Sequence, residues 1–99
     1  MHYVTLAAMT TKDKIQKILR QKFLIDHLEV IDESHNHAGH AEAKKSGGGH
    51  FSVLIVTKDF EGKSLVKRHQ MVYKALGKIK KSIHALAIKT LTPKEAVGS

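Results

Sequence analysis

Residues 51–57 form a nearly continuous apolar run, FSVLIVT, and this run most constrains what the 99-residue chain can fold into. Its β-branched residues favour a strand, and a strand with so few polar positions is typical of the centre of a sheet. Because an apolar sheet face has to be buried against a second layer, we expect helices to pack on this strand.

A helix is expected soon after this strand. Ser64 can cap it, since its hydroxyl can accept a hydrogen bond from an orphan backbone N–H group. Apolar residues then recur at helical spacing and predict a stripe that faces the core: Leu65, His69, Val72, Tyr73 and Leu76. Gly77 can end the helix, and residues 78–82 can add one short helical turn.

The remaining elements follow from the same periodicities. A helix is expected over residues 11–23, capped by Thr10 or Thr11, and strands over 27–33 and 84–90. Pro93 should prevent the last strand from continuing. The element order is α-β-β-α-α-β, in which a loop joins two antiparallel strands and a right-handed crossover adds a parallel one. We therefore expect an α+β fold with a three-stranded mixed sheet and helices on one face.

The chain is expected to form one domain over residues 10–93. Residues 1–9 are predicted to be a flexible arm, and residues 94–99 a frayed tail. Residues 34–49 contain the run SHNHAGH and three consecutive glycines but no hydrophobic pattern, so they predict a mobile loop rich in His and Gly.

Histidine is unusually abundant, with eight residues in the chain, while cysteine is absent. Five of the eight lie between positions 27 and 50, and histidine is the commonest metal ligand in proteins. Absence of cysteine excludes disulfides, thiol catalysis and a cluster held by this chain's own thiolates. No arrangement of residues predicts catalysis, so we do not expect an enzyme.

The net charge of +8 is unevenly distributed along the chain. Residues 1–49 carry seven Lys and Arg against six Asp and Glu, whereas residues 50–99 carry ten against three. A solvated basic surface is the simplest interpretation, and contact with a partner or with nucleic acid is the alternative. The candidate contact residues are Lys67, Arg68, Lys74, Lys78, Lys80 and Lys81.

No apolar run approaches the ~20 residues of a membrane span. The N-terminal residues resemble neither a secretory signal nor a transit peptide. A cytoplasmic location is therefore expected, with a mitochondrial one as the alternative.

Six segments form an ordered pattern along the chain: LEVIDES at 28–34, HF at 50–51, FEGKS at 60–64, RHQMVY at 68–73, IHALAIKT at 83–90 and TP at 92–93. In sequence and spacing they resemble the BolA family over roughly residues 12–93. That resemblance implies a type II KH-like fold, which agrees with the predicted element order. Because the chain has no GxxG motif, we do not expect it to clamp RNA as KH domains do.

The resemblance also implies a function, which the fold alone would not. Members of the family pair with monothiol glutaredoxins of the CGFS class and share one [2Fe-2S] cluster with them. The glutaredoxin supplies a cysteine and the thiolate of a bound glutathione. On this chain the resemblance implies His84 and one loop histidine as ligands, in the order His50, His37 and His40. We expect the isolated chain to hold no cluster and to be a monomer or a weak homodimer.

Three alternatives remain open at this stage. Bacterial members of the family are described as DNA-binding regulators, which connects the basic second half to transcription regulation and the stress response. The loop histidines could instead bind a divalent metal without a partner. His69 is expected to be structural, or to orient a metal ligand through a hydrogen bond.

Overall fold

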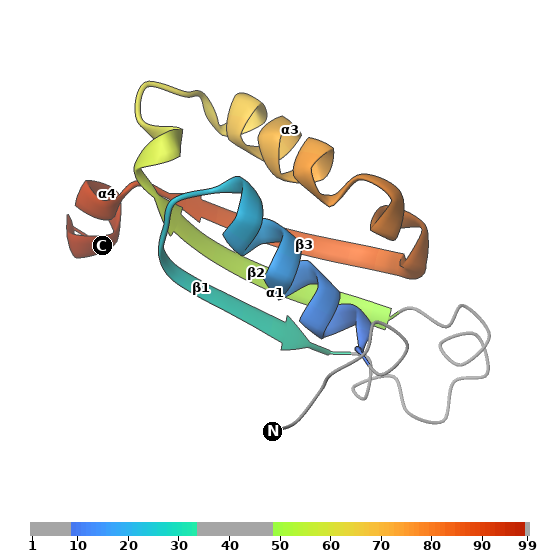
Figure 1. The fold of residues 1–99 in the computed structure, drawn as a ribbon. Helices are drawn as coiled ribbons and strands as arrows, with labels where there is room; N and C mark the ends of the chain where they lie inside the picture. The colour runs from blue at the N-terminus through green and yellow to red at the C-terminus, as the bar shows by residue number, and fades with distance from the viewer. Residues whose placement is uncertain (1–8, 34–48, 99) are drawn as a thin grey trace.

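The computed structural model describes residues 9–33 and 49–98, which form one three-stranded sheet covered by helices. Strands β1 (Ile25–Asp32), β2 (Gly49–Thr57) and β3 (Ile83–Leu91) lie in the order β1-β2-β3 (Figure 1). β2 pairs antiparallel with β1 and parallel with β3. The predicted mixed sheet with a central apolar strand is therefore confirmed.

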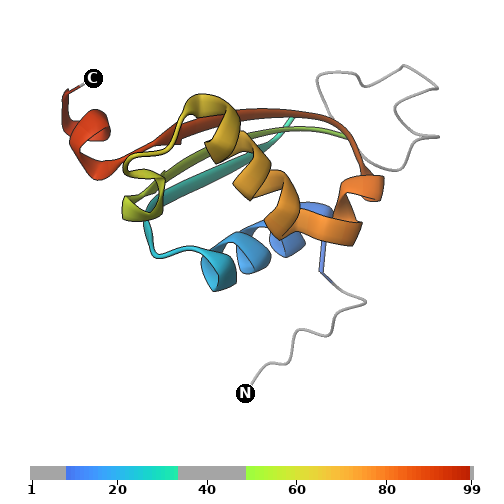
Figure 2. The same ribbon diagram turned by 90° about the horizontal axis from the view of Figure 1, so that it is seen from above.

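Helices α1 (Thr11–Lys22) and α3 (Leu65–Leu76) cover the same face of the sheet (Figure 2). Short 3-10 helices η3 (Lys58–Phe60) and η4 (Gly77–Ser82) flank α3. The expected caps are present: Thr10 and Asp13 form a reciprocal capping box, and Ser64 Oγ accepts from the Lys67 N–H at 3.1 Å. α3 ends at Gly77, whose φ of 56° favours glycine.

The core lies between the sheet and these two helices. Alternate residues of β2 point into it, namely Phe51, Val53 and Ile55, all at most 3% exposed. They pack in one cluster with apolar side chains from α1, β1, η3 and α3: Ile15, Leu19, Phe23, Leu28, Val30, Phe60, Val72 and Leu76. The period-two burial of β2 thus selects one face for the helices and leaves the other more open.

The predicted buried stripe of α3 is partly wrong. Leu65 is 65% exposed and Tyr73 is 38% exposed, whereas Arg68, Val72 and Leu76 are buried. Residues 68, 72 and 76 lie four apart and form the line that faces the sheet. Tyr73 lies one position, about 100°, around the helix from Val72 and therefore falls at the margin of the buried face.

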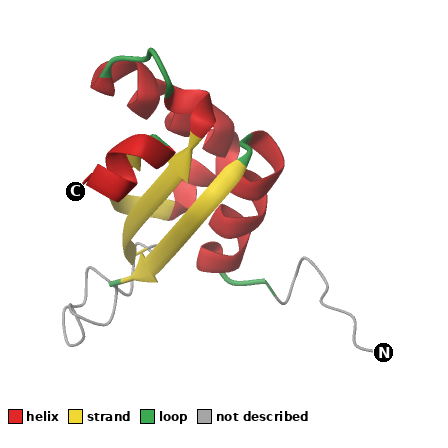
Figure 3. Ribbon diagram, turned by 90° about the vertical axis from the view of Figure 1, so that its left-hand side faces the viewer, coloured by secondary structure: helices red, strands yellow, loops and turns green. Residues whose placement is uncertain are grey.

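The predicted frayed tail is instead a helix, α4 (Pro93–Gly98). Thr92 Oγ1 accepts from the Glu95 N–H at 3.2 Å, and Glu95 Oε1 accepts from the Thr92 N–H at 2.9 Å. This capping box satisfies the first orphan donors, and Pro93 suits the first helical position because that residue needs no N–H. Pro93 ends β3, as expected, but also begins α4. Figure 3 shows α4 on the other side of the strands from α1 and α3.

The predicted arm at residues 1–9 and loop at residues 34–49 fall almost entirely outside the described residues. Gly49 is the exception in the loop, because it is the first residue of β2. Among the described helices, none is long and apolar enough to cross a membrane.

Candidate functional site

Two of the predicted metal ligands, His50 and His84, lie side by side at one end of the sheet. Their ring centroids are 5.1 Å apart and the ring planes are tilted by 35°. His50 is the second residue of β2 and His84 the second residue of β3. Because β2 and β3 run parallel, residues near the start of each strand meet at the same end of the sheet.

A register shift in β3 accounts for the proximity of the two rings. Gly49 pairs with Ile83 but His50 pairs with Ala85, so β3 holds one extra residue, His84, at this point. Strict alternation with Leu86 would direct His84 toward the helices, whereas His50 lies in line with Ser52 on the other face. A β-bulge can re-aim a side chain in this way, which brings His84 next to His50.

The separation of the two rings suits ligation of a single metal ion. Two imidazoles on one tetrahedral metal, each with a metal–nitrogen bond of about 2.0–2.1 Å, have ring centroids about 5 Å apart. The observed 5.1 Å matches this value. His84 is also exposed, so a group supplied from outside could reach it.

Glu33 supports the backbone at His50. The Glu33 N–H donates to the His50 carbonyl oxygen at 2.7 Å, just beyond the last residue of β1. The Glu33 carboxylate accepts a hydrogen bond from the Ser52 hydroxyl. The sequence did not predict a role for Glu33. Its partners His50 and Ser52 lie far along the chain, and no local sequence pattern connects them to Glu33.

Of the other predicted site histidines, His37 and His40 lie outside the described residues. His69 is half-buried one turn into α3, at the end of that helix remote from η4 and His84. Within residues 9–33 and 49–98, no group of three or more His, Cys, Asp or Glu could hold a metal ion.

Exposed lysines lie on the segment that leads into His84. Lys78, Lys80 and Lys81 are exposed on η4, which ends immediately before β3, and the Lys80 ammonium lies 5.9 Å from the centre of the Tyr73 ring. Lys67 and Lys74 are exposed on α3. From position 62 to position 94 the sequence contains nine Lys and Arg and no Asp or Glu. The stretch of chain around His84 is therefore rich in basic residues and carries no acidic ones.

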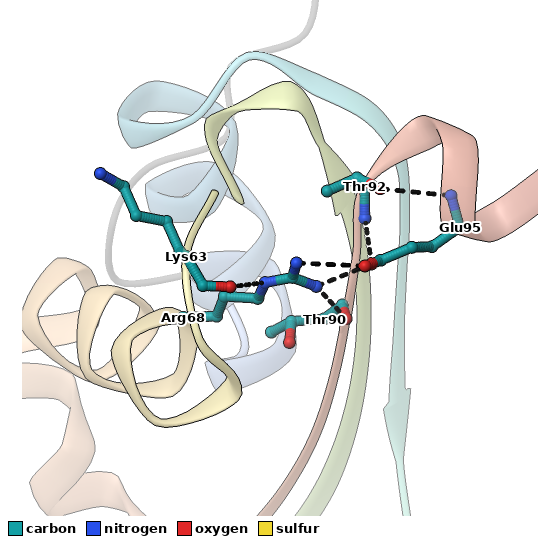
Figure 4. A network of polar contacts seen from close by, with 5 residues as sticks. All are labelled: Lys63, Arg68, Thr90, Thr92 and Glu95. Atoms are coloured by element: carbon teal, nitrogen blue, oxygen red, sulfur yellow. Dashed lines mark hydrogen bonds and ion pairs between the residues drawn. The ribbon is translucent and has the colours of Figure 1, made fainter. Parts of the chain in front are cut away.

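Arg68 does not join these exposed cations, so its prediction as a contact residue is wrong. It is 7% exposed, and its guanidinium donates to the carbonyl oxygens of Lys63 and Thr90 and to both carboxylate oxygens of Glu95 (Figure 4). The two Arg68–Glu95 bonds measure 2.7 and 3.1 Å. A buried arginine whose guanidinium makes four hydrogen bonds within the chain is committed to the fold.

This network lowers the pKa of the Glu95 carboxyl group. Hydrogen bonds from Arg68, and then from the Thr92 N–H, lower the pKa of Glu95 from 4.5 to about 2. The carboxylate therefore stays charged through mildly acidic pH and holds α4 against the start of α3.

Comparison with known proteins gives a consistent family. The BolA-like protein family matches residues 19–95. SufE-like protein 1 of Arabidopsis thaliana, named as chloroplastic/mitochondrial, is 42% identical over 92 residues, and chloroplastic BOLA1 of the same plant is 40% identical over 92. These matches cover 88% and 90% of this chain but only 24% and 55% of the relatives, so the chain spans about a quarter and about half of their length.

A bacterial relative matches over more of its own length. The DNA-binding transcriptional regulator BolA of Escherichia coli is 36% identical over 91 residues, which are 91% of this chain and 83% of that protein. With the two plant relatives in organelles, the cytoplasmic location expected from the sequence stays a prediction.

Solved structures agree with these matches. The BolA domain of SufE1 from Arabidopsis thaliana superposes with a TM-score of 0.72 at 39% identity, covering 88% of this chain and 96% of that one. A bol-like protein from Babesia bovis gives 0.73 at 32% identity, covering 91% and 93%. Sequence motifs, element order and structural similarity all point to one group, and the chain belongs to the BolA-like protein family.

Proposed function

We propose that this protein is a non-enzymatic adaptor that binds a monothiol glutaredoxin of the CGFS class and shares a bridging [2Fe-2S] cluster with it. The complex would serve iron–sulfur cluster assembly or trafficking, or iron regulation. One observation carries the proposal: His50 and His84, from two different strands, have ring centroids 5.1 Å apart at one end of the sheet.

The donor set suits such a shared cluster. A [2Fe-2S] cluster takes four protein ligands, and two imidazoles on one iron are a known alternative to two thiolates. His50 and His84 would supply that pair, and the chain has no cysteine to supply the other two ligands. A partner cysteine and a glutathione thiolate would complete the set. When bound, the cluster would supply one-electron chemistry and transferable iron and sulfide.

The histidine pair also has a surface that a partner can approach. His84 is exposed, and the exposed lysines of η4 precede it directly. Glutathione carries two carboxylates. The η4 lysines would therefore attract bound glutathione as well as an acidic surface of the partner. These lysines would mainly raise the rate at which the two proteins associate. Salt would lower that rate, because it screens the charges.

Anaerobic reconstitution with a CGFS glutaredoxin, glutathione, iron and sulfide tests the proposal. We expect the mixture to give a visible circular dichroism spectrum that neither protein gives alone, and His84→Ala to remove it. His27→Ala is a matched control, because His27 is exposed on β1 and paired with Glu29. A mixed-complex spectrum unchanged by His84→Ala would exclude His84 as a ligand.

A second candidate function is DNA binding. It is favoured by similarity to the Escherichia coli relative, which is a DNA-binding transcriptional regulator. It is also favoured by the exposed lysines of α3 and η4, namely Lys67, Lys74, Lys78, Lys80 and Lys81. Fluorescence anisotropy with duplex DNA at several salt concentrations tests it. Binding through lysine–phosphate contacts should weaken steeply with salt, and the double variant Lys80→Glu/Lys81→Glu should weaken it further. Binding that is undetectable at low salt would exclude this function.

A further inference from the structure

Glu33 occupies an unusual place in the structure, because it connects the end of β1 both to the backbone of His50 and to Ser52. Its N–H donates to the His50 carbonyl oxygen at 2.7 Å, and its carboxylate accepts from the hydroxyl of Ser52, two residues further along β2. Two hydrogen bonds from one residue therefore hold β2 at His50 and just after it. Glu33 itself is half-buried, and the Ser52 hydroxyl is its hydrogen-bond donor on β2.

Glu33, His50 and Ser52 share one face of the sheet, the face that does not contact α1 and α3. Phe51 and Val53 point to the helices, so His50 and Ser52 lie on the opposite face of β2. Ile31 pairs with Ser52, and Glu33 follows two positions later, so the Glu33 side chain shares that face. Directly opposite residues of an antiparallel pair have Cβ atoms about 4.5–5.5 Å apart, which places Glu33 and His50 in contact range.

The hydrogen bond from the Glu33 N–H to the His50 carbonyl lies just past the last paired residues of β1 and β2. The ladder between β1 and β2 ends at Asp32 and Phe51, and Glu33 and His50 are the next residues outward. Ends of strands fray unless side chains hold them. A displaced His50 would no longer lie 5.1 Å from His84, so the distance between the two rings depends on what holds this end of β2.

We infer that Glu33 is a positioning residue for His50: through Ser52 and the His50 backbone it fixes the His50 imidazole beside His84. This inference rests on the proposed function and deepens it, because it distinguishes His50 as the histidine presented in advance of partner binding. Metal ligands are commonly oriented by hydrogen-bonded groups behind them, and here the Glu33 carboxylate would act one step removed, through Ser52.

The test uses the free full-length chain without iron or partner, with labelled histidine. Nuclear Overhauser cross-peaks between the His50 and His84 rings report their proximity. We expect Glu33→Ala to reduce the cross-peak about two-fold or more and Ser52→Ala to do the same, with the double variant no worse than either one. Glu33→Gln should retain the cross-peak, because an amide oxygen can accept the same bond from Ser52.

Glu29→Ala is the matched control, since Glu29 lies on β1, on the same face of the sheet as Glu33, but pairs with His27. It should leave the His50 signals unchanged. The inference is overturned if Glu33→Ala and Ser52→Ala change the His50 and His84 signals no more than Glu29→Ala does. Ser52→Ala keeps the test decisive should Glu33→Ala fail to fold.

The outcome is independent of whether a cluster forms. A wild-type chain that shows the cross-peak but gives no cluster with a glutaredoxin would count against the proposed function alone. A chain that forms the cluster but keeps its cross-peak in both variants would count against the role of Glu33 alone.

Discussion

The two ends of the sheet are built differently. At one end, Arg68 and Glu95 join α3 to α4, and the Arg68 guanidinium is nearly fully buried and makes four hydrogen bonds. At the other end, His50 and His84 lie close together with one ring exposed and lysines nearby. At the first end, which we call the closed end, most polar groups are bonded within the chain, whereas at the second, the open end, the exposed His84 can be reached by an outside ligand. Under the proposed function, stability and recognition are separated along the strands.

The largest expected effect on stability comes from a substitution at the closed end, where Arg68 pairs with Glu95. Arg68→Ala removes bonds to Lys63, Thr90 and Glu95 together with the contact between the guanidinium and the Phe60 ring. We expect the free energy of unfolding in urea to fall by about 2–4 kcal/mol. Lys67→Ala, a neighbouring exposed position on α3, should change it by less than about 0.5 kcal/mol. Equal effects of the two variants would show that the network does not stabilise the fold.

The next prediction compares two buried threonines in the same half of the sheet. Thr57 Oγ1 donates to the Leu24 carbonyl at 2.7 Å and accepts from the Asp59 N–H at 3.1 Å. Thr90 Oγ1 is the one buried side-chain polar atom without a hydrogen-bond partner in the described part of the chain. Thr57→Val should therefore cost about 1–3 kcal/mol in thermal or urea unfolding, because it leaves buried partners unsatisfied.

Thr90→Val should instead be neutral or stabilising by up to about 1 kcal/mol, since it replaces an unpaired buried hydroxyl with a methyl group. A loss of stability at Thr90 equal to that at Thr57 would mean that the Thr90 hydroxyl is bonded in solution.

Acid should remove the stabilisation that Glu95 supplies at the closed end. The pKa of Glu95 is about 2 in the folded protein and 4.5 as an ordinary value, so its contribution is fully present above pH 4.5. That contribution is lost as pH falls from 4.5 toward 2, because the unfolded chain takes up the proton first. Glu95→Gln should be less stable than wild type at neutral pH, and the gap should narrow through this window.

Urea unfolding across a pH series measures the gap between wild type and Glu95→Gln. Glu61→Gln, in the exposed turn before α3, is the control. A gap that stays constant down to about pH 2 would contradict the ion pair as its source.

The smallest effect on stability is expected at the open end. His84 is exposed, so His84→Ala should change the free energy of unfolding by less than about 0.5 kcal/mol while it removes the cluster spectrum. A loss comparable to that of Arg68→Ala would show that the histidine pair is part of the stabilising core, and the contrast between the two ends would fail.

Sequence reasoning predicted the strands and their directions because each rests on a local pattern. β2 reads as a central strand from its own composition, and the short crossover through α3 allows only one hand. The caps at Thr10 and Ser64 are likewise local. The helix α4 could have been found in the same way, because Thr92-Pro-Lys-Glu95 is a capping-box pattern with proline at the first helical position.

The remaining features depend on contacts between distant positions. Arg68 lies in a basic stretch and resembles its exposed neighbours, but its partner Glu95 is 27 residues away. The extra residue in β3 that re-aims His84 appears only in the pairing with β2. Glu33 acts through Ser52 and His50, neither of which a local pattern connects to it. The resemblance to a family identified both histidines, and the fold explains why they meet.

The most direct test of the central claim is a count of histidine nitrogens on the cluster. Pulsed electron paramagnetic resonance of the reduced complex, with this chain's histidines labelled with nitrogen-15, reports each coordinated imidazole separately. We predict two directly bound histidine nitrogens in the wild-type complex and at most one in His50→Ala or His84→Ala. A wild-type spectrum with no bound histidine nitrogen, or with a count that neither variant reduces, would contradict the account.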